Sequence, residues 1–287
     1  MNEPLTRGRA PGWWVEQMWD RVAFHVSASW DADVDRAWRS AGEPHVIWHG
    51  TSDDGLGWVA GTDIWSLAVD GPVSLVALQG AERLTRLIVL RPEADSQPVD
   101  WSQLPGLRAF DGSNPRGSGF DLLHLEDLSL WDFEGRDLAG LPFGPALRSC
   151  RLSPARRLRS LEGVEAATGL TELTLGYAPT TDYSPLSRLP QLAELTLAAC
   201  PGVTDLSWIT QLTTMQQLTL ENCKNVSGFL PIAEHRTLGT VALTGSTRPG
   251  DRDYRCLLGA HASHVYVETL PTWADVRRSE LAARFPG

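Results

Sequence analysis

The chain has 287 residues, of which 42% are hydrophobic and 21% are charged, a composition typical of a folded water-soluble protein. Its formal net charge of −10 argues against nucleic-acid binding, which needs a clustered basic face. The sequence shows no run of about 18 apolar residues and no apolar stretch after its first arginines, so neither a membrane span nor a secretory signal is expected. We therefore expect a cytoplasmic protein.

Residues 1–50 predict an N-terminal cap with the order strand, helix, strand. The runs VAFHVSA and HVIWHG have the alternation of strands, and DADVDRAWRSAG between them predicts a helix with Val34 and Trp38 on one face and Gly42 as its stop signal. The chain has 12 tryptophans. We interpret those near the N-terminus as core and cap packing, with an exposed aromatic recognition patch as the alternative. The early tryptophans are Trp13, Trp14, Trp19 and Trp30.

Residues 51–270 repeat one apolar frame, LxxLxL. Three clear copies begin at Leu170, Leu192 and Met215, so the frame advances by 22 and then 23 residues. Weaker copies extend the series in both directions. They are Ile64/Leu67/Val69, Leu84/Leu87/Val89, Leu104/Leu107/Ala109, Leu125/Leu128/Leu130, Leu147/Cys150/Leu152, Leu238/Val241/Leu243 and Ala262/Val265/Val267.

Alternation within each copy predicts a short strand with one buried and one solvated side. A single strand cannot hide its leucines, so stacked copies must share one core. We therefore predict an α/β solenoid with a curved parallel sheet and short convex helices or 3-10 turns. Cys200, Cys223 and Ser246 follow the strands as small buried turn residues, and Asp182 and Asp205 can cap the convex turns.

Residues 271–287 predict a closing element. The run LPTWADVRRSELAARF indicates a short helix with Leu281 and Phe285 facing inward. Such a helix would cover the core of the last repeat, which would otherwise be exposed to water.

The segment DYSPLSRLPQLAELTLAACPGVTDLSWITQL resembles the roughly 22-residue class of leucine-rich repeats in internalins and SDS22-like proteins. Similar arrays end many bacterial NACHT-type NTPases, where they act as sensor domains. The resemblance covers Thr168–Ser246 most closely, although the usual asparagine of the turn is replaced. It implies a leucine-rich-repeat fold and a role in recognition. Abundant arginine with little lysine suggests a bacterial source.

The sequence lacks the common catalytic and metal-binding motifs. The sequence contains no GxSxG, GxxxxGK[ST], GxGxxG or HExxH. The glycine-rich run at 111–119 lacks the lysine of a phosphate cradle and predicts a loop insertion, or alternatively a loop that contacts a partner. Cys256, His261 and His264 form the one loose metal-like group, while His45 and His49 would lie about 13 Å apart on a strand. We expect no enzyme activity, cofactor or metal.

The residues between the buried leucines point to the concave side of the predicted sheet. Arginine and large aromatic side chains, which contribute most to binding at interfaces, occur there beside carboxylates. The predicted partner-binding residues are Arg86, Arg108, Phe110, Asp127, Trp131, Arg151, Glu172, Tyr177, Glu194 and Glu221.

These features favour a monomeric protein-binding module. Arg108, Trp131 and Arg151 would anchor the partner, and Glu172 and Glu194 would fix its register. The acidic chain is compatible with a basic protein partner. Two alternatives stay open: a scaffold or oligomerisation unit that uses the tryptophan-rich end, and an enzyme with a site in the loops 111–119 or 246–256.

Overall fold

The computed structural model describes residues 7–10, 12–18, 21–27, 29–50, 55–71, 74–90, 99–113, 117–118 and 122–286. They form two compact units, Met1–Leu125 and Glu126–Gly287, called unit 1 and unit 2 below. Within the described ranges, every helix is too short or too polar to span a membrane.

Unit 1 joins an antiparallel hairpin to a ladder of parallel strands. β1 pairs with β2 and β2 with β3 in antiparallel fashion, and β3, β4, β5, β6 and β8 then pair in parallel. The strands are β1 Arg7–Ala10, β2 Trp13–Met18, β3 Arg21–Val26, β4 His45–Trp48, β5 Ser66–Val69, β6 Arg86–Val89 and β8 Ala109–Ser113, with a separate pair β7 Val99–Asp100 and β9 Gly117–Ser118. The parallel ladder thus begins with β3–β4, inside residues 1–50.

The helix α1, Ala32–Ser40, lies where the sequence predicted it. The Asp31 carboxylate accepts hydrogen bonds from the amides of Asp33 and Val34, which satisfies two free N–H groups of the first turn. Val34 and Trp38 are buried, and Gly42 has a φ of 88°, a conformation that suits glycine after a helix. The hairpin strands β1 and β2 were not predicted. The short 3-10 turns of unit 1 are η1 Val59–Gly61, η2 Leu75–Leu78 and η3 Trp101–Gln103.

Three tryptophans of unit 1 pack against one another. Trp30 stacks on Trp58 with ring centroids 4.9 Å apart and meets the edge of Trp38 at 5.8 Å. Trp38 and Trp48 are fully buried. Aromatic contacts of this kind add to the free energy gained by burial, so core packing, as interpreted from the sequence, accounts for most of these rings; Trp19 lies outside the described residues.

Unit 2 is a ladder of parallel strands with one unchanging register. Leu173, Leu195, Leu218 and Val241 face one another across successive strands and are buried. Because each covers the next, every strand hides its apolar side only through its neighbours. The strands are β10 Asp127–Trp131, β11 Ser149–Leu152, β12 Glu172–Gly176, β13 Glu194–Ala198, β14 Gln217–Glu221, β15 Thr240–Thr244 and β16 His264–Val267.

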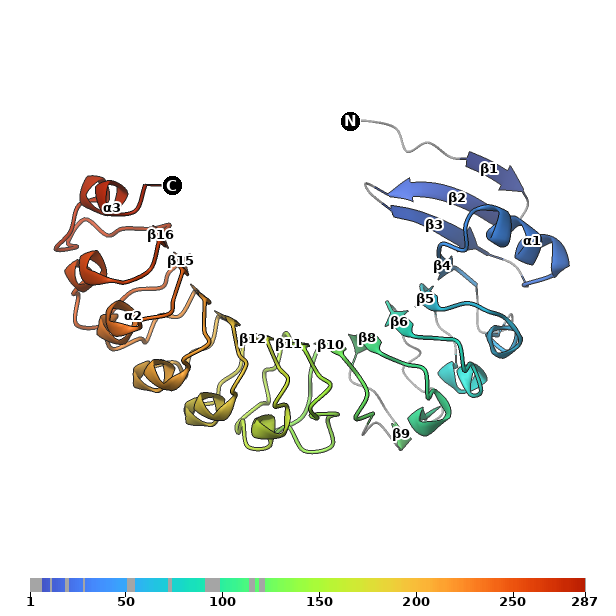
Figure 1. Cartoon of the computed structure of the whole chain (residues 1–287), viewed down its shortest axis with the longest axis horizontal. Coiled ribbons are helices and arrows are strands. Elements are labelled where there is room, and N and C mark those ends of the chain that lie inside the picture. Colours follow the sequence, from blue (N-terminus) through green and yellow to red (C-terminus); the bar gives the residue numbers. More distant parts are fainter. Residues whose placement is uncertain are drawn as a thin grey trace. The chain divides into compact units, whose positions relative to one another are not determined.

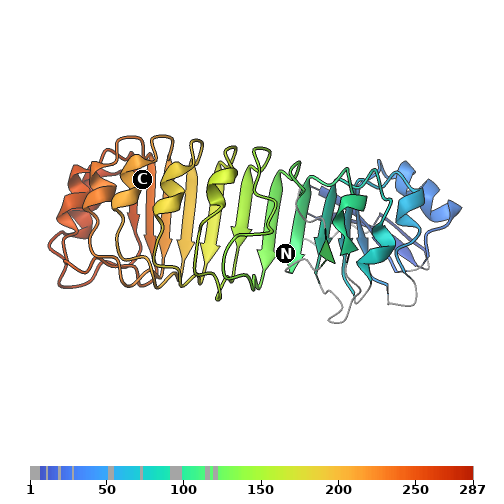
Figure 2. The same cartoon turned by 90° about the horizontal axis from the view of Figure 1, so that it is seen from below.

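Short helical turns return the chain along the other side of the core of unit 2, as Figure 1 shows, and Figure 2 shows the strands side by side. The Asp182 carboxylate accepts a hydrogen bond from the amide of Ser184, and Asp205 does the same for Ser207. Hydrogen bonds from these serines hold the pKa of both carboxyls below its usual range. Each aspartate thus binds the first amide of its turn, as predicted, but from one position before the N-cap residue, which is Tyr183 in η5 and Leu206 in η6. The turns are η4 Val164–Ala166, η5 Ser184–Arg188, η6 Ser207–Gln211, α2 Leu230–Glu234 and η7 Arg255–Gly259.

The helix α3, Arg278–Arg284, closes unit 2 as expected. Leu281 and Phe285 are buried. The Arg278 guanidinium donates to the backbone oxygen of Glu268, which follows β16. The C-terminal helix therefore lies against the last repeat.

One left-handed residue ends the strand in most repeats of unit 2. Tyr177, Ala199 and Asn222 have φ values of 58°, 51° and 54°, and Gly245 has 61°. This conformation turns the amide toward the next repeat: the N–H of Ala199 donates to the backbone oxygen of Glu221 at 2.7 Å. The bond between repeats thus requires a backbone shape that costs a non-glycine residue about 1–2 kcal/mol.

A buried ladder of thiol and hydroxyl groups follows these turns. The Cys200 thiol donates to the backbone oxygen of Leu175, and that of Cys223 donates to Leu197, both at 3.4 Å. In the next repeat Thr247 takes this place and donates to Leu220 at 2.9 Å. The expected residue was Ser246, and the prediction is wrong by one position because the backbone of the preceding turn carries an extra residue before re-entering the core.

The predicted frame of one copy in unit 1 is also wrong. Arg86 pairs with Ala109 and Leu87 with Phe110, so the strand lies three residues later than the frame Leu104/Leu107/Ala109 implies. Phe110 is consequently a core residue, 3% exposed. Residues 111–113 belong to β8 instead of the predicted loop.

Replacing Ala199 by glycine should stabilise the protein. Glycine adopts the left-handed conformation freely, and this gain outweighs its extra entropy in the unfolded chain, so the free energy of unfolding should rise by roughly 0.5–1 kcal/mol. Ala198→Gly, one residue earlier in β13, is the matched control and should lower it by about the same amount. Urea unfolding of the two variants measures both; a loss of stability in Ala199→Gly would contradict the assigned backbone shape.

The buried thiols should be unreactive in the folded protein. Burial raises the pKa of Cys150 to about 12 and that of Cys223 to about 12, so almost no thiolate forms at neutral pH. Reaction with a chromogenic disulfide reagent should be at least roughly a hundredfold slower than in denaturant, where all four cysteines react. Rapid modification of Cys150 without denaturant would contradict its burial.

Candidate functional site

The strand face of unit 2 is the side of β10–β16 whose side chains alternate with the buried row and lie opposite the helical turns. Burial alternates along β13 and along the first four residues of β12, where Glu172 and Glu194 are exposed while Leu173 and Leu195 are buried. Most of the predicted partner-binding residues occupy this face. Asp127, Arg151, Glu172, Glu194 and Glu221 are exposed on it, and Trp131 is half-buried.

Carboxylates dominate the strand face. Arg151 is the one arginine or lysine among its strand positions in the described part of unit 2. Asp127, Glu172, Glu194 and Glu221 carry the negative charge. The face therefore has an excess of negative charge, which favours a positively charged partner.

Glu172 and Glu194 are direct neighbours on adjacent strands. They face each other in register in the pairing of β12 and β13, where strands lie about 4.8 Å apart. Across the described residues, neither carboxylate has an ion-pair partner within 4.0 Å. Like charges in this position destabilise a sheet by about 0.2–1 kcal/mol, so the pair is unfavourable in the free protein.

Tyr177 lies at the border of this face. It follows β12 directly, is 48% exposed, and has the Arg156 guanidinium over its ring at 4.9 Å. The contact is a cation–π interaction, which keeps a large aromatic ring fixed at the surface. Tyr177 and Arg156 together offer an aromatic and a cationic group beside the carboxylates; Arg156 was not among the predicted residues.

The three predicted residues of unit 1 have different surroundings. Arg86 is exposed on β6. Arg108 precedes β8 and its guanidinium donates to the backbone oxygens of Pro105 and Gly106 at 3.4 and 3.3 Å. Phe110 is buried against Trp101, with ring centroids 5.2 Å apart. The placement of Arg108 and Phe110 on the strand face was wrong because the frame of this copy is shifted by three residues.

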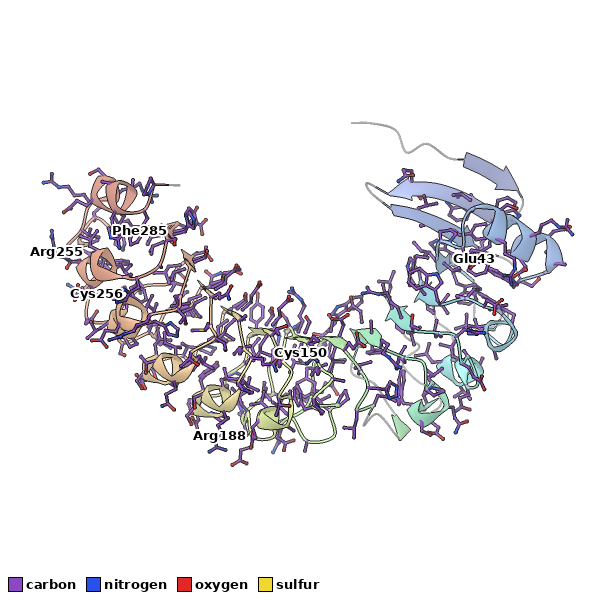
Figure 3. The ribbon with its side chains drawn as sticks, viewed as in Figure 1. Glu43, Cys150, Arg188, Arg255, Cys256 and Phe285 are labelled. Atoms are coloured by element: carbon purple, nitrogen blue, oxygen red, sulfur yellow. The ribbon has the colours of Figure 1, made fainter. Side chains whose placement is uncertain are left out.

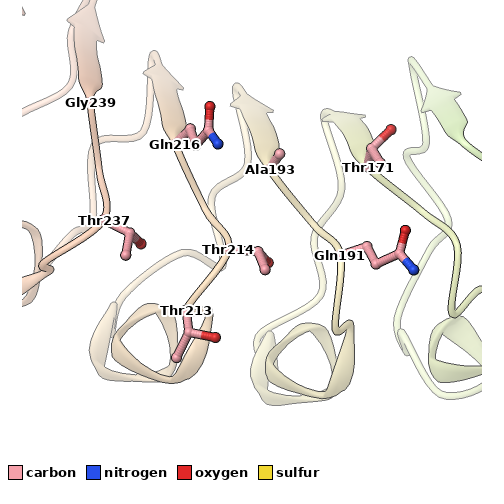
Figure 4. A pocket seen from close by; sticks show the side chains of 8 residues that line it. All are labelled: Thr171, Gln191, Ala193, Thr213, Thr214, Gln216, Thr237 and Gly239. Carbon is pink, nitrogen blue, oxygen red and sulfur yellow. The ribbon is translucent and has the colours of Figure 1, made fainter.

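A shallow groove of about 480 Å³ runs along the start of the strands in unit 2 (Figure 4). Its threonine hydroxyls are turned to the backbone: Thr214 donates to the oxygen of Leu192 and Thr237 to that of Met215, both at 3.0 Å. No charged side chain lines it. The groove is lined by Thr171, Gln191, Ala193, Thr213, Thr214, Gln216, Thr237 and Gly239. Its polar groups serve the stacking of repeats, and we assign no chemistry to it.

The acidic residues of the loop 246–256 have structural roles. In residues 246–256, Asp251 and Asp253 accept hydrogen bonds from the amides of Asp253 and Cys256, so they shape the turn before η7. Figure 3 shows Cys256 at η7 and Cys150 within the strand region of unit 2. Across the described ranges, no three histidine, cysteine, aspartate or glutamate side chains are grouped as metal ligands. Residues 114–116 and 119 of the other loop lie outside the described residues.

One cluster of titratable groups was missed. Glu16, His25, His49 and Asp70 lie side by side in unit 1. The signal was available in part, since His25 and His49 each sit beside buried residues of a predicted strand. Their meeting required the parallel register of β3 and β4, in which His25 lies opposite Ile47.

No protein-family model matches the chain, and no curated protein matches it. Similarity is found among solved structures. InlJ of Listeria monocytogenes, described as including a cysteine ladder, has a TM-score of 0.51 and 14% identity over 82% of this chain and 59% of its own. The internalin InlF of the same organism has a TM-score of 0.49 and 15% identity over 82% and 68%.

A structure of the Drosophila Toll–Spätzle complex has a TM-score of 0.48 and 10% identity over 95% of this chain and 40% of its own. This chain thus spans about three fifths of InlJ and two fifths of the Toll chain. Identities this low compare folds and carry no activity or partner across. The parallel register of unit 2 and the likeness to InlJ show that the chain has the leucine-rich-repeat fold found in internalins.

Proposed function

We propose that the chain is a non-catalytic protein-binding module that uses the strand face of unit 2. The observation that carries this proposal is the uncompensated pair Glu172 and Glu194. Such a like-charge pair destabilises the free protein, but basic groups of a bound partner would remove the repulsion in the complex. The partner we propose is a protein that presents basic side chains.

The neighbouring residues supply the other parts of an interface. Trp131 and Tyr177 offer partly exposed aromatic surface, and aromatic side chains contribute strongly to binding when a partner covers them. Arg151 adds one cation among the carboxylates, which would fix the orientation of a partner through opposite charges. Arg108 is left out of the proposal because it lies off this face.

The alternatives have less support. The tryptophans available for an oligomerisation surface are mostly used within unit 1, where Trp30, Trp38 and Trp58 contact one another. A catalytic site in the loops would need converging titratable groups, whereas Asp251 and Asp253 bind backbone amides. We include in the proposal a monomeric state. We also include a cytoplasmic location, for which the buried unpaired thiols are the support.

Charge reversal on the strand face should abolish partner binding. In the variant Glu172→Lys/Glu194→Lys, basic groups of the partner would meet lysines, and affinity should fall at least about tenfold. The matched control is Glu162→Lys/Glu234→Lys, which changes the same charge at exposed residues outside the strands. Each protein is immobilised, and retention from native extract is quantified by mass spectrometry at two salt concentrations.

A protein retained by the original chain and the control but not by the face variant, and released as salt rises, is the expected result. Equal retention by both variants would contradict the proposed face. Retention that does not change with salt concentration would contradict a partner that binds through its basic side chains.

Removing one charge of the pair should stabilise the free protein. Glu194→Gln ends the repulsion with Glu172, and the free energy of unfolding should rise by about 0.2–1 kcal/mol at low salt. Glu162→Gln, at an exposed turn position, should change it by less than about 0.5 kcal/mol. Thermal unfolding measures both. A clear loss of stability in Glu194→Gln would mean that the carboxylate has a structural role.

A further inference from the structure

A row of hydrogen-bonding side chains crosses four consecutive strands of unit 1. We call it the histidine relay, and it consists of Glu16 on β2, His25 on β3, His49 directly after β4 and Asp70 directly after β5. These side chains come from positions that alternate with core residues such as Phe24 and Trp48. Strand pairing therefore sets their spacing.

The contacts of the relay are short and continuous. His25 Nδ1 lies 2.9 Å from His49 Nε2, in hydrogen-bond geometry. His49 Nδ1 is hydrogen-bonded to an Asp70 carboxylate oxygen at 3.2 Å. At the other end, His25 Nε2 lies 3.2 Å from Glu16 Oε2, which is ion-pair distance.

The middle of the relay is shielded from water. Trp14 stacks on the His25 ring with centroids 4.7 Å apart and on the His49 ring at 5.4 Å. His25 is 7% exposed. Its Nε2 is buried and has no hydrogen bond in the described structure, although it faces a carboxylate. A buried ring nitrogen without a hydrogen bond lowers the stability of the folded protein. This nitrogen is therefore the place where the relay is incomplete.

The hydrogen-bond partners favour one placement of the hydrogens in the neutral relay. A carboxylate only accepts, so His49 Nδ1 carries a hydrogen and donates it to Asp70. A neutral His49 then has a bare Nε2, which accepts from His25 Nδ1–H. In a neutral His25 the remaining nitrogen, Nε2, is therefore a bare lone pair that points at the negative charge of Glu16.

We propose that the histidine relay is a two-step proton switch: one proton binds between His25 and Glu16 and completes the relay, and a second proton breaks it. With the first proton on His25 Nε2, each of the three contacts holds one hydrogen between its two atoms. A second proton can enter only at His49 Nε2, because the other three nitrogens already carry hydrogens. Two N–H groups would then oppose each other across the His25–His49 contact, and the rings must separate.

The surrounding charges set the pH of the first step. Burial lowers the pKa of His25, and the neighbouring His49 ring lowers it further. Glu16 raises this pKa, but the net result is a lowered value. The next titratable group on this face is His45, whose Nδ1 is hydrogen-bonded to Ser66 at 2.6 Å. Since the unfolded chain binds this proton more readily than the folded one, stability falls as pH drops below about 6.5.

The first test reads the tautomers in the original chain. Two-bond ¹H–¹⁵N spectra of the ¹⁵N-histidine-labelled protein, recorded between about pH 8 and about pH 4, distinguish Nδ1–H, Nε2–H and imidazolium rings. At high pH both His25 and His49 should be Nδ1–H tautomers. On acidification the first added hydrogen should appear on His25 Nε2, facing Glu16. An Nε2–H tautomer of His25 at high pH would overturn the proposal.

The second test removes the carboxylate that holds the first proton. In Glu16→Gln the midpoint of the first step should move down by about one pH unit, the usual effect of losing a neighbouring opposite charge. Glu162→Gln, at an exposed turn position of unit 2, is the control and should leave this midpoint unchanged. Because the tautomers are read in the unsubstituted protein, the proposal stays testable even if Glu16→Gln does not fold. An unchanged midpoint in a folded Glu16→Gln would contradict it.

The opening step has its own measurement. Nuclear Overhauser effects between the Trp14 indole and the His49 ring should persist through the first step and disappear when both histidines are imidazolium. Their persistence with both rings charged would show that the contact does not break, and the switch would be refuted. The proposed binding at the strand face of unit 2 would be unaffected, since the relay uses only residues of unit 1.

Discussion

Each strand of unit 2 can bury its apolar side only if the next strand presents the same positions to it. Leu195 lies between Leu173 and Leu218, and a displacement of one residue would turn all of these leucines toward water. The stack therefore fixes the register before any other feature. The left-handed residue after the strand, the buried thiol or hydroxyl, and the aspartate before the turn all recur because the strand that precedes them is fixed.

The same register determines the strand face. Residues at equal positions of successive copies must become neighbours, whatever their charge, so Glu172 and Glu194 adjoin because they share a position in the frame. The core constrains only the alternate residues, and a solenoid can vary its exposed row with little effect on folding. For this reason the composition of the exposed row is informative about binding, while the composition of the buried row reflects packing.

The sequence predicts the structure of a repeat well only where the LxxLxL pattern fits that repeat in a single frame. In unit 2 the frame was correct, since Leu170, Leu192 and Met215 are followed by well-spaced leucines. The copy around β8 has two readable frames, and the true one ends in Gly112, where a Cβ would lie 3.2 Å from that of Val89. Glycine gives no apolar signal, so Arg108 and Phe110 were assigned to the wrong side.

The histidine relay was beyond sequence reasoning for a different reason. His25, His49 and Glu16 are separated along the chain and meet only through an antiparallel hairpin, which was not predicted, and a parallel pairing within residues 1–50. Period-2 patterns identify which side of a strand a residue takes, but they do not say which strands are neighbours. The acidic row of unit 2, in contrast, follows from the repeat itself.

The amide–carbonyl bonds between repeats have a mechanical consequence. The bond from Ala199 to Glu221, and its equivalents, run along the stack from one repeat to the next, so a tensile load on the two ends of unit 2 would not be shared by all strands at once. Each repeat is held only by its neighbours, so the load would act most strongly on the repeat of β16, which pairs with β15 alone. Under force such a stack would unfold one repeat at a time, beginning at the last repeat. The helix α3 would then resist unfolding mechanically, in addition to shielding the core from water.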